Sequence, residues 1–197
     1  MNHPEFTELR RKLDEAITFQ ELTAAKRLAR EGLRLAQERE CLGEVMYFRA
    51  QQKIVAGKHG EASGYLRKAL EFNPHDGAAY NDLALCRVEL GKIDGVLELF
   101  DTGIGVEPDY ATIHHNKGWF LNQLGHYKEA LACFERALAL DPCRAVTYEN
   151  MADAYENLGR IDDAIGAYQK VLDLLGPSAD VIKTQIKREI ARLEKRR

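Results

Sequence analysis

The histidines and cysteines of this chain are spaced in a way that argues against a catalytic or metal site. His114 and His115 are adjacent. On a helix they would point about 100° apart, so they could not share a metal ion. His114 takes a packing position and is predicted to be a core histidine. The cysteines form no Cys-x-x-Cys pair, so a zinc or redox motif is not indicated; they are Cys41, Cys86, Cys133 and Cys143.

Paired carboxylates and clustered glycines form no catalytic motif either. Asp162 and Asp163 follow a turn glycine and are typical of the negative charge found in the first turn of a helix. The closely spaced glycines between 91 and 105 lack the lysine that a phosphate-binding loop requires. Since no nucleophile and base stand together, the sequence predicts no catalytic residue, no metal and no cofactor.

A regular spacing of prolines indicates the elements that must position all these residues. Pro74, Pro108 and Pro142 stand 34 residues apart, and Pro177 falls one residue beyond the next step. Glycines, small residues and large apolar residues keep the same period: Gly57, Gly91, Gly125 and Gly159; Ala62, Val96, Ala130 and Ala164; and Leu66, Phe100, Phe134 and Tyr168. A fixed period of this length indicates a stack of similar small units rather than one globular core.

One period shows what each unit contains. A first helix is expected over about 111–124, ended by Gly125, which can adopt the left-handed conformation. A second helix over about 127–140 carries one apolar stripe and ends before Pro142, which cannot continue a helix. Gly118 and Ala130 are small where the two helices should cross closely. Neither helix buries its stripe alone, so the pairs must stack.

These residues resemble the tetratricopeptide repeat, through Gly118, Gly125-x-Tyr127-x-x-Ala130-x-x-x-Phe134-x-x-Ala137 and Asp141-Pro142. The resemblance implies an all-α fold, a right-handed superhelical solenoid of antiparallel helix pairs, as a single domain over 1–197. Repeats are predicted at 43–76, 77–110, 111–144 and 145–178, with a degenerate helical hairpin at 6–39 and a C-terminal capping helix at 179–197. Ser178 is the predicted N-cap of that last helix.

The resemblance also implies a binding surface, a concave groove lined by the first helix of each repeat. The groove positions predict a partner-binding set that changes from aromatic and apolar to amide-rich and acidic along the chain. Its members are Tyr47, Phe48, Gln51, Asn81, Asp82, Leu85, His115, Asn116, Trp119, Asn122, Glu149, Asn150 and Asp153. The implied function is a non-catalytic protein-protein interaction scaffold or adaptor that binds a peptide or helix segment.

The side chains of this set indicate what the partner contains. Asparagine can both donate to and accept from a peptide backbone, and Trp119 could anchor an apolar side chain. The acidic end favours lysine or arginine on the partner. An equally weighted interpretation is that Tyr47, Phe48 and Leu85 only pack between neighbouring first helices.

One subclass of the family clamps the C-terminal carboxylate of heat-shock chaperones with a lysine and an arginine in its third repeat. Asn81 and Asn116 fill some of the positions, but Val146 and Asn150 stand where the cations are required. Without cations a buried carboxylate lacks its partner, so the sequence argues against this activity.

Charge is unevenly distributed within a net charge of −3. Residues 77–110 hold two basic and seven acidic residues, whereas residues 179–197 hold seven basic and three acidic ones. The basic tail could contact an acidic patch on a second copy and give a homo-oligomer, or contact nucleic acid, and a solvated terminal helix is the alternative. No apolar run is long enough to span a membrane, and the first residues lack a secretory pattern, so a cytoplasmic protein is expected.

Overall fold

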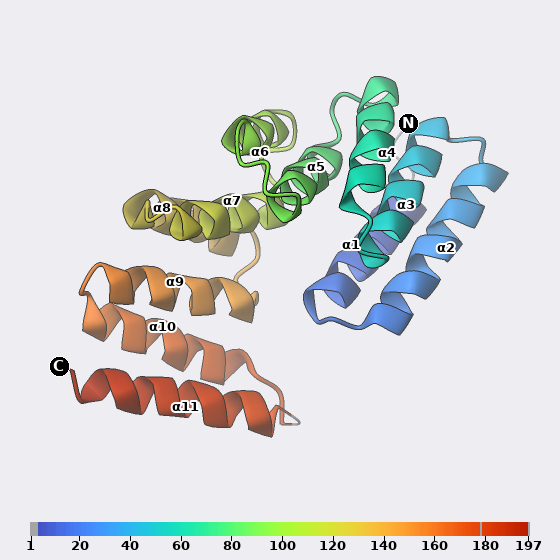
Figure 1. The fold of residues 1–197 in the computed structure, drawn as a ribbon. Coiled ribbons are helices and arrows are strands. Elements are labelled where there is room, and N and C mark those ends of the chain that lie inside the picture. Colours follow the sequence, from blue (N-terminus) through green and yellow to red (C-terminus); the bar gives the residue numbers. More distant parts are fainter. Residues whose placement is uncertain (1–3, 178, 197) are drawn as a thin grey trace. The chain divides into compact units, whose positions relative to one another are not determined.

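The structure, a computed structural model, describes residues 4–177 and 179–196, and within them it contains eleven α-helices and no strand (Figure 1). The helices are α1 (Pro4–Thr18), α2 (Leu22–Glu38), α3 (Leu42–Val55), α4 (His59–Phe72), α5 (Gly77–Glu89), α6 (Val96–Val106), α7 (Ala111–Gln123), α8 (Tyr127–Leu140), α9 (Ala145–Asn157), α10 (Ile161–Leu174) and α11 (Asp180–Glu194). The all-α fold class predicted from the sequence is confirmed. The predicted N-cap Ser178 lies outside the described residues.

The chain forms two compact units, Met1–Pro108 with α1–α6 and Asp109–Arg197 with α7–α11. In each unit consecutive helices pack on one another, so α2 lies between α1 and α3, and α8 between α7 and α9. Figure 1 shows α9, α10 and α11 side by side in the second unit. The assignment of the whole chain to one domain stays a prediction.

A residue in the left-handed backbone conformation follows the first helix of each pair. Gly57, Gly91, Gly125 and Gly159 have φ between 68° and 80°, in the turns where the sequence predicted glycine for this purpose. In the degenerate first hairpin, which has no turn glycine, Gln20 takes the same conformation with a φ of 56°. A glutamine suffers a steric penalty there, which the packing of α1 on α2 must offset.

The predicted close crossing within a helix pair is confirmed at Gly118. A Cβ atom added to Gly118 would lie 2.7 Å from the Phe134 ring and 3.1 Å from the Ala130 carbonyl oxygen. Phe134 and the residues one and two periods earlier, Phe100 and Leu66, are completely buried. The 34-residue period therefore corresponds to one large side chain per pair that fills the space left by small residues opposite.

The first hairpin is joined to the rest of its unit by Arg10. Its guanidinium group donates to both carboxylate oxygens of Asp76 (2.9 and 2.8 Å) and to Glu44 (2.9 and 3.2 Å), and it stacks 3.6 Å from the Tyr47 ring centroid. Asp76 also accepts from the Ala79 backbone N–H (2.9 Å) and so caps α5. One side chain of α1 thus links α3 with the start of α5.

Candidate functional site

The predicted partner-binding residues all lie on the first helix of a pair, on α3 and α5 in the first unit and on α7 and α9 in the second. Their exposure separates them into two groups. The buried ones are Tyr47, Phe48, Gln51, Asn81 and His115. The half-buried or exposed ones are Asp82, Leu85, Asn116, Trp119, Asn122, Glu149, Asn150 and Asp153.

The side chain of Phe48 is packed inside the first unit, as the packing interpretation expects. Its ring fills the space beside Gly32 of α2, where an added Cβ atom would lie 2.2 Å away. It also lies 6.1 Å from the Phe6 ring and 5.5 Å from the Tyr47 ring, between centroids. Phe48 and Tyr47 are therefore not accessible to a partner in this structure.

A polar cluster surrounds Asp82 on the face shared by α3 and α5. The Asp82 carboxylate accepts from the Gln51 amide on one oxygen and from the Asn81 amide on the other (3.1 Å). Burial, together with the charge of the nearby Asp14 carboxylate, raises the pKa of Asp82 to about 7 against these hydrogen bonds. Gln51 and Asn81 therefore orient a carboxylate rather than a partner's backbone.

His115 of α7 is buried against α9. Its Nδ1 lies 2.9 Å from the Thr147 hydroxyl, and its ring centroid is 5.9 Å from that of Phe134. Burial, with the positive charge of Arg144, lowers the pKa of His115 to about 3, so the imidazole is neutral at pH 7. Both adjacent histidines are buried, which confirms the core role predicted for His114.

The α9 face carries the acidic end of the predicted set. The Tyr168 hydroxyl of α10 donates to Asp153 (3.0 Å). Burial raises the pKa of Glu149, and the charge of Asp153, one turn further along the helix, raises it again. Burial likewise raises the pKa of Asp153, against the Tyr168 hydrogen bond. These two carboxylates are suited to a cation that would relieve their mutual repulsion.

The positions of Arg192 and Arg196, near the C-terminus, were not predicted from the sequence. Arg192 donates to both oxygens of Glu156 on α9 (2.8 and 2.6 Å), and Arg196 donates to Glu156 as well. The excess of acidic charge in 145–178 and of basic charge in 179–197 could have indicated this contact within one chain. The charge pattern alone predicted such a contact only between two copies.

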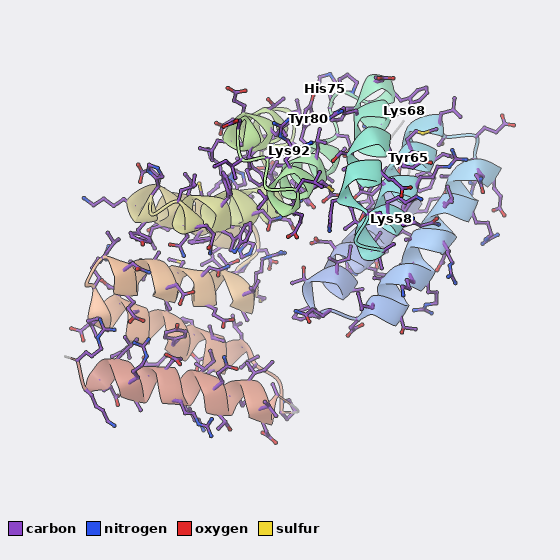
Figure 2. All side chains as sticks on the ribbon, in the orientation of Figure 1. Lys58, Tyr65, Lys68, His75, Tyr80 and Lys92 are labelled. Carbon is purple, nitrogen blue, oxygen red and sulfur yellow. The ribbon has the colours of Figure 1, made fainter. Side chains whose placement is uncertain are left out.

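A second set of basic and aromatic side chains lies on α4, on the start of α5, and on the segments before α4, between α4 and α5, and after α5. Figure 2 labels its members, Lys58, Tyr65, Lys68, His75, Tyr80 and Lys92. Glu61 lies among them and pairs with Lys58 (3.2 Å) and with Lys53. Glu61 therefore offsets part of the positive charge at the Lys58 end of this set.

The described parts of the chain contain neither a metal-binding group nor a membrane-crossing helix. No group of histidine, cysteine and carboxylate side chains among residues 4–177 and 179–196 could hold a metal ion. Within the same residues no helix combines the length and hydropathy that a bilayer span requires. Cys86 is buried, whereas Cys133 is half-buried.

Comparison with known proteins identifies the family. Two tetratricopeptide repeat models match residues 54–116 and 109–176, which together cover more than half of the chain. The chain belongs to the tetratricopeptide repeat family. No curated protein sequence matches it.

Solved structures share the fold at low sequence identity. TTC0263, a thermophilic TPR protein of Thermus thermophilus, superposes with a TM-score of 0.70 at 22% identity over 95% of this chain and 98% of that one. MamA of Desulfovibrio magneticus RS-1 gives 0.68 at 22% over 79% and 85%. YrrB, described as a TPR protein with an unusual peptide-binding site, gives 0.61 at 19% over 89% and 88%. Membership of the family supports a general protein-binding role.

Proposed function

We propose that this protein is a non-catalytic adaptor that binds a peptide or helical segment on the first-helix faces of its repeats. The main supporting observation concerns the second unit, where α7 and α9 keep a row of polar and aromatic side chains at least partly accessible: Asn116, Trp119, Asn122, Glu149, Asn150 and Asp153. Repeat proteins of this kind bind through preformed surfaces, so little ordering cost falls on their own backbone.

The chemistry of this row favours a partner with apolar and basic residues. The asparagines can each donate to and accept from a peptide backbone, and the Trp119 indole offers a large rigid contact. The raised pKa values of Glu149 and Asp153 mark carboxylates that a lysine or arginine would stabilise in the charged form. The lack of a cation pair for a terminal carboxylate argues against chaperone clamping.

The buried members of the predicted set take a different part in this proposal. Tyr47, Phe48, Gln51, Asn81 and His115 are buried and would position the first helices rather than contact the partner. Asp82 and Leu85 remain half-buried, so the first unit contributes a smaller surface. A continuous groove over both units, and a cytoplasmic location, stay predictions.

The alternatives are a self-assembling structural protein and an accessory module for nucleic acid, both through the basic C-terminal helix. In this structure two of its cations, Arg192 and Arg196, are engaged by Glu156 of the same chain. That contact lowers the charge available for a second copy or a polyanion. Light scattering over a range of salt concentrations distinguishes self-assembly, and steep salt dependence of DNA binding distinguishes the nucleic-acid module.

A peptide selection tests the adaptor proposal. The intact chain, immobilised, should enrich a random peptide library for sequences with apolar residues next to lysine or arginine. The double variant Asn122→Ala, Trp119→Ala should lose most of this enrichment, whereas Gln169→Ala, on the exposed side of α10, should retain it. A selection dominated by acidic peptides, or equal enrichment by the double variant, would contradict the proposal.

A further inference from the structure

The helix α11 is attached to its unit by few contacts. Only Ile186 and Leu193 of its residues are buried, and its N-cap Ala179 makes no side-chain hydrogen bond. Near its start Val181 is 83% exposed and Ile182 is 49% exposed. In Figure 1 it lies along α10 at the end of the second unit. With two buried side chains holding this terminal helix, its polar contacts contribute a larger share to keeping it in place than they would in a central helix.

The main polar contact of α11 is an arginine cluster on Glu156 of α9. Arg192 binds both oxygens of this carboxylate in a forked arrangement (2.8 and 2.6 Å), and its Nε donates to Glu189 (2.7 Å). Arg196 also donates to Glu156, whose side chain is 20% exposed. These hydrogen bonds lower the pKa of Glu156, the opposite of the shift at Asp153. Forked arginine–carboxylate pairs are among the stronger polar contacts in proteins.

Glu156 belongs to the same row of α9 as the two carboxylates assigned to a basic partner. The spacing of Glu149, Asp153 and Glu156 is four residues and then three, which places them along one side of a helix. Two guanidinium groups of the chain therefore already occupy one end of this row. They are the chemical group that the row would recognise on a partner.

We propose that α11 and the turn after it form an autoinhibitory element, in which Arg192 of α11 and Arg196, two residues beyond its end, compete with a basic partner segment for the carboxylate row of α9. The proposal rests on the function proposed above. A partner's arginine or lysine binds this row fully only when Arg192 and Arg196 leave Glu156. If the row is free in a fraction f of molecules, the apparent dissociation constant rises by a factor 1/f. Release of α11 and partner binding are thus thermodynamically coupled.

Hydrogen exchange of α11 tests the contact itself. The double variant Arg192→Gln, Arg196→Gln removes both cations, and the control Lys187→Gln, Arg188→Gln removes two exposed cations from the same helix, so the change in net charge is equal. Amides of α11 should exchange about fivefold faster or more in the first variant, while the control stays near the wild type. Equal exchange in the two variants would overturn the role of the arginine cluster.

Binding of hexa-arginine, followed by fluorescence anisotropy, tests the competition. The Arg192→Gln, Arg196→Gln variant should bind about three- to tenfold more tightly than the control variant. Adding Glu149→Gln and Asp153→Asn should abolish this gain. Equal affinity of the two variants would overturn autoinhibition and leave the function standing, whereas absence of binding to every protein would overturn the basic-partner function itself. The exchange measurement reports on the arginine cluster in either case.

Discussion

Two ionisable side chains on the first helices, one in each unit, have pKa values that are shifted in opposite directions by their surroundings. The native pKa of His115 lies below its ordinary value because its imidazole is buried beside Arg144. The native pKa of Asp82 lies above its ordinary value because its carboxylate is buried near Asp14. A group whose pKa differs between the native and unfolded states makes the free energy of unfolding depend on pH.

For His115 we expect a loss of stability in mild acid. The unfolded histidine titrates near 6.5 and the native one at about 3, so between these values the unfolded chain binds more protons. Its contribution is complete above pH 6.5 and is lost as the pH falls. Between pH 7 and 5 the wild type should lose about 1–2 kcal/mol more than His115→Gln in urea unfolding. Equal losses for the two proteins would show that the imidazole is not kept neutral by burial.

For Asp82 the pH dependence of stability has the opposite sign, so we expect a loss of stability as the pH rises. The native carboxyl titrates at about 7 and the unfolded one near 3.9, so the native state holds the extra proton between these values. The contribution is complete below pH 3.9 and is lost as the pH rises through 7. The stability of Asp82→Asn relative to the wild type should therefore increase by about 2–3 kcal/mol from pH 5 to 8. A relative stability that stays constant with pH, measured by urea unfolding, would contradict the raised pKa.

Position within the repeat predicted which helix carries each site residue but not which side chains remain accessible. Phe48 is inaccessible because Gly32, in the degenerate hairpin, leaves room for its ring. His115 is inaccessible because the hydroxyl of Thr147, 32 residues later, lies within hydrogen-bond distance of its Nδ1. Both facts depend on the particular side chain of a neighbouring repeat, which a periodic pattern averages out. The accessibility of the acidic α9 residues was easier to predict, because charged side chains stay near the surface.

At the scale of the element, the helix pair is where sequence prediction was most successful. The expected helix at 127–140 coincides with α8, and the expected helix at 111–124 differs from α7 by one residue. The exception is α6, which begins at Val96 rather than one period before Tyr127. Gly95 there takes a left-handed conformation with a φ of 70°, so the turn after Gly91 is longer than in the other pairs.

Two glycines on neighbouring pairs should respond to alanine with opposite signs. Gly118→Ala gains helix propensity, but its Cβ would overlap the Phe134 ring, and overpacking of this kind costs about 1–3 kcal/mol. Gly166 lies on the exposed side of α10, away from the helix ends, and no neighbouring atom lies within 4 Å of an added Cβ. Gly166→Ala should therefore stabilise the protein by about 0.5–1 kcal/mol. Thermal unfolding of the two variants measures the difference. A melting temperature of Gly118→Ala at or above that of the wild type would exclude the close crossing.

At the scale of the whole molecule, stability should be transmitted from each helix pair to its neighbours. Within each of the two units, the described helices pack mainly on the preceding and following helix. Stability in such stacks is close to a sum of terms for each pair and each interface between pairs. Arg10 is an exception to local packing, since it bridges α1 to Glu44 and to Asp76, 66 residues away.

Removal of Arg10 should therefore loosen the start of the chain most. Arg10→Met leaves Asp76, with a side chain only 5% exposed, and Glu44 without their shared cation, and breaking a buried pair costs about 3 kcal/mol. Asp76 still caps α5 through Ala79, so that helix should persist. Hydrogen exchange should accelerate strongly in α1 and α2, less in α5 and least in α10. The same acceleration in α1 and α10 would contradict this gradient and would favour one cooperative domain over the whole chain, as the sequence predicts.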